Sequence, residues 1–258
     1  MRAIPIIVLF LIIFIHSYSI ESKANLIPFK FKCDTILTND NVYEIVSIGN
    51  DSAWKEYDEP QENRDYFIIE RIDKNIYENQ KANAVQFILF DSTLHRKQEG
   101  IIELSCSQKN VKISDSLADD ENRTEYAYIG QIKLLNAYMV LGLYYENYAY
   151  ILFDKTTGQQ TINFGELPFI SPIKKYIVTL RANPYTDNAE VELYKLSGSE
   201  NIKHLITLSF CNWMPDEGKF IFWSKDGYLY VPVNHPNNYW LKNGNLNSEF
   251  EYIRIKVK

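Results

Sequence analysis

The chain has 258 residues, of which 46% are hydrophobic and 23% are charged, and its formal net charge is -6 at pH 7. This composition is typical of one globular domain, or of two small ones, and it excludes a disordered or collagen-like chain. The basic residues occur singly or in short pairs such as Arg96 and Lys97. Because binding to a phosphate backbone requires clustered Lys and Arg, nucleic acid is not expected as a partner.

The N-terminus has the pattern of a secretory signal peptide. Arg2 precedes an apolar run from Ile6 to Ile15, which is followed by a polar stretch. The run has the ~7–15 residues expected of a signal peptide and falls short of the ~20 that a membrane-spanning helix needs. Small residues favour cleavage after Ala24, with cleavage after Ser19 as the alternative. Residues 1–24 are therefore predicted to be a signal peptide, and an uncleaved anchor is the other interpretation.

The remaining residues, 25–258, are predicted to form a single β-rich domain that is periplasmic or secreted. They contain no further apolar run long enough to span a membrane. An exported chain with Cys33, Cys106 and Cys211 favours one disulfide and one leftover thiol. Cys33 and Cys106 each continue one apolar face of an alternating run, so they are the candidate pair, although three unpaired thiols remain the alternative. No cysteine or histidine spacing fits zinc, and no metal or cofactor is predicted.

Most of the chain alternates apolar and polar residues with a period of two, which is typical of strands. In chain order the predicted strands are Val42–Ile48, Tyr66–Ile72, Ala84–Asp91, Ile101–Cys106, Tyr126–Ile132, Ala137–Tyr145, Ala149–Asp154, Gln160–Phe164, Tyr176–Leu180, Glu190–Leu196, Lys203–Phe210, Lys219–Trp223, Tyr228–Val233 and Phe250–Val257. The spacing in Phe67–Gln80 also permits a helix. Asp226 and Gly227 predict a hairpin with a type I′ turn. The fold class is therefore all-β, with antiparallel sheets.

Two pieces of the sequence recur with a period of about 40–45 residues, as propeller blades do. Ala149–Gly158 matches Ala189–Gly198, because each is an alternating strand that ends in a glycine turn. Phe169–Val178 matches Trp213–Phe222 around a proline. We expect Pro172 and Pro215 to be equivalent, and Phe169 and Trp213 to pack between neighbouring sheets.

Met214–Phe222 resembles the Ser-Pro-Asp-Gly-Lys turn of the bacterial WD40-like repeats of the TolB type, with one inserted residue, and Ser171–Val178 keeps its Ser-Pro. The resemblance covers residues 145–233, about a third of the chain. It implies a β-propeller-like arrangement, incomplete or closed, with room for about five blades. A two-sheet β-sandwich is the alternative architecture.

No catalytic motif stands out. The nucleophile elbow, the paired zinc histidines and the phosphate-binding glycine loops are all missing from the sequence. His95, His204 and His235 are isolated from one another, and His204 is expected to be a surface or half-buried residue rather than a base. The chain is therefore not predicted to be an enzyme.

Tyr144, Tyr145, Tyr148 and Tyr150 could stack against a ligand, although tyrosines in strands usually pack across the sheet. The expected function is a non-catalytic binding or scaffolding module of the cell envelope, with a protein or a glycan as partner. A carbohydrate-active or other hydrolase that uses unmarked carboxylates is the first alternative, and a structural envelope protein is the second. Two carboxylates ~5–10 Å apart in a deep pocket would favour the hydrolase.

Overall fold

The computed structural model describes residues 45–50, 53–56, 66–119, 121–183, 188–197, 201–210, 213–216 and 220–258. The predicted signal peptide, Cys33 and Cys211 lie outside these ranges.

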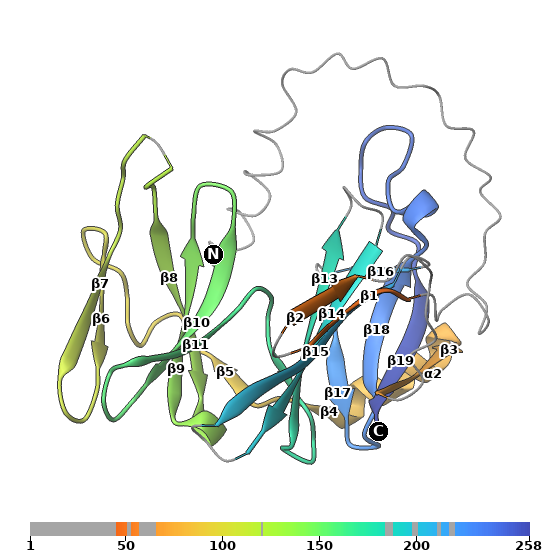
Figure 1. Cartoon of the computed structure of the whole chain (residues 1–258), viewed down its shortest axis with the longest axis horizontal. Helices are drawn as coiled ribbons and strands as arrows, with labels where there is room; N and C mark the ends of the chain where they lie inside the picture. The colour runs from red at the N-terminus through yellow and green to blue at the C-terminus, as the bar shows by residue number, and fades with distance from the viewer. Residues whose placement is uncertain are drawn as a thin grey trace. The chain divides into compact units, whose positions relative to one another are not determined.

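The fold is all-β, as predicted, and the described strands form three larger antiparallel sheets and one separate hairpin (Figure 1). Sheet I has the strand order β11-β10-β9-β8-β5, and its strands are β5 Ile88–Phe90, β8 Glu125–Ile132, β9 Ala137–Leu143, β10 Tyr148–Asp154 and β11 Gln160–Phe164. Sheet II has the order β12-β13-β14-β15-β1-β2, with β12 Phe169–Ile170, β13 Tyr176–Asn183, β14 Asn188–Leu196, β15 Ile202–Phe210, β1 Ile45–Asn50 and β2 Ala53–Glu56.

Sheet III has the order β3-β19-β18-β17-β4, and β16 pairs with β18. Its strands are β3 Phe67–Ile72, β4 Ala84–Val85, β16 Met214–Pro215, β17 Phe222–Ser224, β18 Leu229–Asn234 and β19 Glu251–Val257. The separate hairpin consists of β6 Ile101–Ser105 and β7 Asn110–Ser114. Within the described ranges the helices are α2 Lys74–Gln80 and the short 3-10 turns η1 Lys81–Asn83, η2 Lys133–Leu135 and η3 Pro236–Asn238.

The chain differs from the sequence prediction in several places, and the short strands β2, β12 and β16 were not predicted. Phe67–Gln80 holds a strand followed by a helix, because β3 alternates against the core while α2 buries Tyr77 on one side. Ala84–Asp91 is two strands, since β4 pairs with β17 of sheet III and β5 pairs with β8 of sheet I. The strand β7 is mostly polar and was not predicted. Val111 and Ile113 are its only apolar residues, which is too few to show an alternating pattern.

The predicted hairpin joins β17 and β18, but the turn is not type I′. Only Gly227 has a positive φ, at 85°, and its N–H donates to the Ser224 carbonyl at 2.9 Å. The Asp226 side chain accepts from the Tyr228 N–H at 3.1 Å, which fixes the turn without a positive φ at the aspartate.

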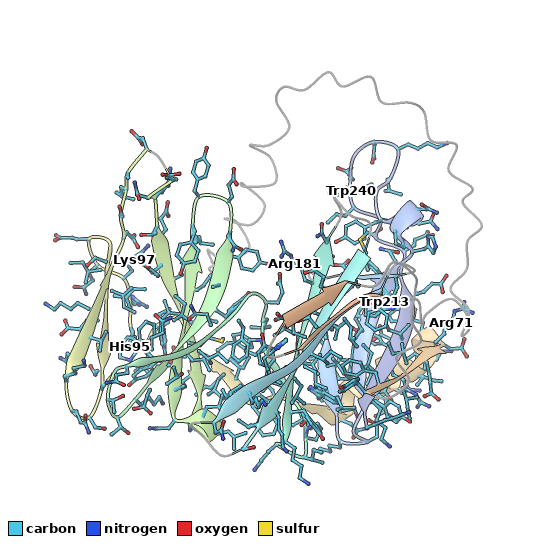
Figure 2. All side chains as sticks on the ribbon, viewed as in Figure 1. Arg71, His95, Lys97, Arg181, Trp213 and Trp240 are labelled. Carbon is cyan, nitrogen blue, oxygen red and sulfur yellow. The ribbon has the colours of Figure 1, made fainter. Side chains whose placement is uncertain are left out.

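Sheets II and III bury one hydrophobic core between them. Its members from the two sheets include Val178, Leu180, Val191, Leu193, Ile206, Leu208, Leu229, Val231, Val233, Ile253 and Ile255. Trp213 is fully buried in this core (Figure 2). Phe169 packs against the same core, and the Phe169 backbone carbonyl accepts a hydrogen bond from Trp223 Nε1 at 3.0 Å. Both aromatic residues therefore lie between neighbouring sheets, as predicted.

The predicted equivalence of the two prolines is wrong. Pro172 lies in the turn that follows β12, whose residues pair with β13. Pro215 is buried inside β16 and pairs with Val233 of β18.

The two strands matched at an offset of about 40 residues, β10 and β14, are inner strands of different sheets, one with five described strands and one with six, so the repeat stays a prediction. The described sheets do not close into a propeller.

Sheet I is covered on both faces. One face packs against the β6–β7 hairpin, and this core contains Ile102, Leu104, Ile113, Tyr128, Tyr138, Val140, Ile151 and Phe153. The alternate residues Met139 and Leu152 point to the other face and are also buried. Phe164 of β11 is fully buried and meets Tyr194 of sheet II with ring centroids 5.0 Å apart.

Candidate ligand-binding site

The structure separates the four tyrosines that the sequence grouped. Tyr148 and Tyr150 are alternate residues of β10 and meet edge to face, with ring centroids 6.3 Å apart. Tyr145 lies in the preceding turn and is 55% exposed. The Tyr144 hydroxyl lies over Gly142 beside Ile151, on the face that the β6–β7 hairpin covers. Only Tyr148 and Tyr150 therefore share a site.

Glu166 lies directly beside this tyrosine pair. The Tyr148 hydroxyl is 2.7 and 2.6 Å from the two oxygens of the Glu166 carboxylate, to which it donates a hydrogen bond. Glu166 is only 8% exposed and follows β11 by two residues. The pairing of Tyr150 with Phe164 sets the register of β10 and β11, so the backbone of sheet I places the carboxylate beside the hydroxyl.

Arg181 of β13 approaches the same carboxylate from sheet II. Its Nε is 3.8 Å from Glu166 Oε1, and its Nη1 is 3.9 Å from Glu190 Oε2 on the neighbouring strand (Figure 2). Both contacts exceed the ~2.7–2.9 Å of a charge-assisted hydrogen bond. The Arg181 side chain is 52% exposed, so it can turn towards a ligand without breaking a hydrogen bond to either carboxylate.

A polar row crosses sheet II next to Arg181. Thr179, Glu192 and Thr207 are cross-strand neighbours on β13, β14 and β15. Glu192 Oε2 accepts from the hydroxyls of Thr179 and Tyr194, each at 2.8 Å. Burial, followed by the charge of Glu192, raises the pKa of Tyr194, which keeps this hydroxyl protonated as a donor. The row therefore fixes the Glu192 carboxylate in one orientation.

His204 completes the polar row, and the prediction of a surface or half-buried residue is confirmed. It is half-buried, its Nε2 lies 2.9 Å from Thr207 Oγ1, and its ring meets Tyr194 at 5.1 Å. His95, by contrast, is 9% exposed between Tyr128 and Tyr138.

Cys106 follows β6 and is a half-buried free thiol that packs against the same core as Ile102 and Leu104. Its predicted partner Cys33 lies outside the described residues, so the disulfide stays a prediction. Within the described ranges, no group of three His, Cys, Asp or Glu side chains is placed to hold a metal ion.

The site combines groups that bind hydroxyl-rich molecules. Tyr148 and Tyr150 offer aromatic rings, Glu166 and Glu190 offer acceptors, and Arg181 offers five N–H donors. The charged members could not be predicted from the sequence, because Glu166 and Arg181 belong to different sheets and meet only through the packing of those sheets. The alternation of Glu190, Glu192 and Tyr194 with buried apolar residues in β14 was the available signal.

Comparisons with protein-family models, curated proteins and solved structures found no match to this chain. None of the helices in the described ranges has the length and apolar character of a membrane span.

Proposed function

We propose that the protein is an exported, non-catalytic binding module of the cell envelope, and that its ligand contacts Tyr148, Tyr150, Glu166 and Arg181. The observation that carries the proposal is the half-exposed Arg181 guanidinium, which lies within 4 Å of two carboxylates without a close hydrogen bond to either. A ligand that supplies better-placed hydroxyl groups can engage the guanidinium and the carboxylates together. Among the expected partners, a glycan fits this chemistry better than a protein surface.

A carbohydrate-active hydrolase is the second candidate. Glu166 and Glu190 approach the same guanidinium, which places their carboxylates within about 10 Å of each other, in the range of glycosidase pairs. Arg181, however, bridges the two carboxylates, where a hydrolase needs room for the glycosidic bond and a water molecule. This bridging favours binding over hydrolysis.

Two further parts of the proposal rest on the sequence. The N-terminal pattern supports export, with a mature chain that begins near Asn25. N-terminal sequencing of the protein from the cell envelope tests this, and an intact Met1 in the membrane fraction would contradict it. A propeller-like arrangement rests on the TolB-type turn sequences alone, while the non-equivalent prolines and the core shared by sheets II and III favour the two-sheet sandwich.

The experiment for the binding site is a screen of the purified protein against a glycan panel and against sedimented insoluble peptidoglycan. We expect at least one glycan to bind, and Arg181→Ala to weaken that binding about ten- to hundredfold, as expected for loss of one or two charge-assisted hydrogen bonds. Tyr148→Phe should weaken it less, because the ring remains.

Arg71→Ala is the matched control, since the Arg71 side chain is 42% exposed, pairs with Glu251 and lies on β3 of sheet III. It should bind like the wild type. Equal losses in Arg181→Ala and Arg71→Ala would place the glycan elsewhere, and no binding on any glycan would move the proposal to a protein partner.

A further inference from the structure

His95 sits in an aromatic box between the β5–β6 connection and sheet I (Figure 2). Its ring centroid is 4.9 Å from that of Tyr128 and 4.7 Å from that of Tyr138, at nearly right angles to both. His95 is 9% exposed and Tyr128 is 4% exposed. Among the described residues, His95 Nε2 and the Tyr128 hydroxyl are the buried side-chain nitrogen and oxygen atoms without a hydrogen-bond partner.

These surroundings suit a neutral imidazole. A hydrogen bond with the Glu103 backbone serves one side of the ring, while a proton on Nε2 would have no acceptor in place. The charges that face His95 are Asp91, on its own segment, and Lys155, which follows β10 and lies over the Tyr138 ring at 4.8 Å. Burial has the largest effect and lowers the pKa of His95, while the attraction of Asp91 is opposed by the repulsion of Lys155.

The other titratable groups around the box do not supply a compensating charge. Burial raises the pKa of Tyr128 and of Tyr138, so both are neutral below pH 9. Burial also raises the pKa of Cys106, the thiol next to Tyr138. A proton on His95 would therefore introduce an uncompensated charge between the hairpin and sheet I.

The β6–β7 hairpin is held over sheet I by few polar contacts. The Tyr138 hydroxyl donates to the Ser105 carbonyl at 2.8 Å, and the backbone N–H groups of Ser107 and Gln108 donate to the carbonyls of Lys155 and Thr156, each at 2.8 Å. The rest of the attachment is the apolar core that includes Ile102 and Leu104. Just after the hairpin, Ser116 forms a β-bridge with Thr124, and Asp115 Oδ1 accepts from the Tyr126 N–H at 2.8 Å, so the end of the hairpin stays joined to β8. The strands β6 and β7 themselves pair with no other strand of the described chain, so they can separate from sheet I without breaking a sheet.

We propose that His95 is a pH-sensitive latch, and that its protonation releases the β6–β7 hairpin from sheet I. Release uncovers the face of sheet I that carries Tyr128, Tyr138, Val140 and Ile151, an apolar surface that the hairpin covers in the structure. The latch is independent of the proposed glycan site, which lies on the opposite face of β10.

The test is amide hydrogen exchange of the full chain between pH 7.5 and 5.0, corrected for the pH dependence of intrinsic exchange. An opened hairpin exposes a histidine with a pKa near 6.5, so protection of β6 and β7 amides should fall by up to about thirtyfold over this range. Amides of β6 and β7 should exchange faster than those of β9 and β10 throughout this range, because the hairpin opens without unfolding sheet I. Equal exchange in the hairpin and in β9 and β10, or a hairpin whose protection does not depend on pH, would overturn the latch.

His95→Gln removes the titration and should make hairpin protection independent of pH. His235→Gln is the matched control, because burial also lowers the pKa of His235, and it lies after β18 in sheet III. It should respond to pH like the wild type. If His95→Gln does not fold, the pKa of His95 can be measured in the wild type from the rate of hydrogen exchange at its imidazole C2 carbon. A pKa at or above 6.5 for this histidine would overturn the latch.

Discussion

Replacing Trp213 by alanine removes one of the two tryptophan side chains in the core between sheets II and III. Trp213 has 0% exposure, and its ring centroid lies 5.1 Å from that of Phe210. It precedes β16, so the substitution leaves the strand pairing of Met214 and Pro215 unchanged. The perturbation is therefore a cavity between two sheets, rather than a change of backbone structure.

The size of the effect follows from the buried area. A buried tryptophan removes about 200 Å² from water, worth roughly 5 kcal/mol at 25 cal/mol per Å². Measured Trp→Ala substitutions in cores cost about 3–5 kcal/mol, because the surroundings relax only in part. We expect a loss in this range, which lowers Tm by roughly 6–20 °C for a domain of this length.

Urea unfolding followed by far-UV circular dichroism measures the loss as a shift of the midpoint at constant slope. Trp240→Ala is the matched control, since Trp240 is 41% exposed, and it should cost less than about 1 kcal/mol. A loss below about 1 kcal/mol for Trp213→Ala as well would refute a shared core between sheets II and III.

Three further predictions concern other parts of the molecule. Gly130→Ala should lower the free energy of unfolding, measured in urea, by more than about 1 kcal/mol, because a Cβ at this position would meet the β5 backbone. An unchanged free energy would show that β5 does not pair with β8 at this point. The free energy of unfolding should fall as the pH drops from 7.5 towards 5. Burial lowers the pKa of His95 and of His235, so the unfolded chain binds more protons than the folded chain below pH 6.5. Urea midpoints that do not change with pH would contradict this. Non-reducing peptide mapping of the exported protein should find Cys33 linked to Cys106, with a stabilisation of about 4 kcal/mol, and a peptide with free Cys106 would rule the link out.

The strands could be predicted because alternation and turn residues are local signals. The run Tyr176–Leu180 became β13 and the run Phe250–Val257 became β19, each within a few residues. The pairing partners could not be predicted, since β3 joins β19 from the other end of the chain. The predicted equivalence of Pro172 and Pro215 was wrong for the same reason. A turn motif does not specify which strand its flanking residues pair with.

The candidate site was predictable only in part. Tyr148 and Tyr150 were singled out because alternate residues of a strand share a face. Tyr144 was grouped with them, but the turn before β10 sends its side chain to the other face. Glu166 and Arg181 come from different sheets, and only the packing of these sheets brings the two side chains together.

The Arg181 site is proposed to bind its ligand without changing it chemically. The most direct test incubates the protein with the glycan that it binds best, recovers the glycan and measures its mass. We expect the wild type to return the glycan at its original mass, and Arg181→Ala to retain much less of it. A shortened glycan whose formation is abolished by Glu166→Gln or Glu190→Gln would contradict binding without chemistry and establish a hydrolase.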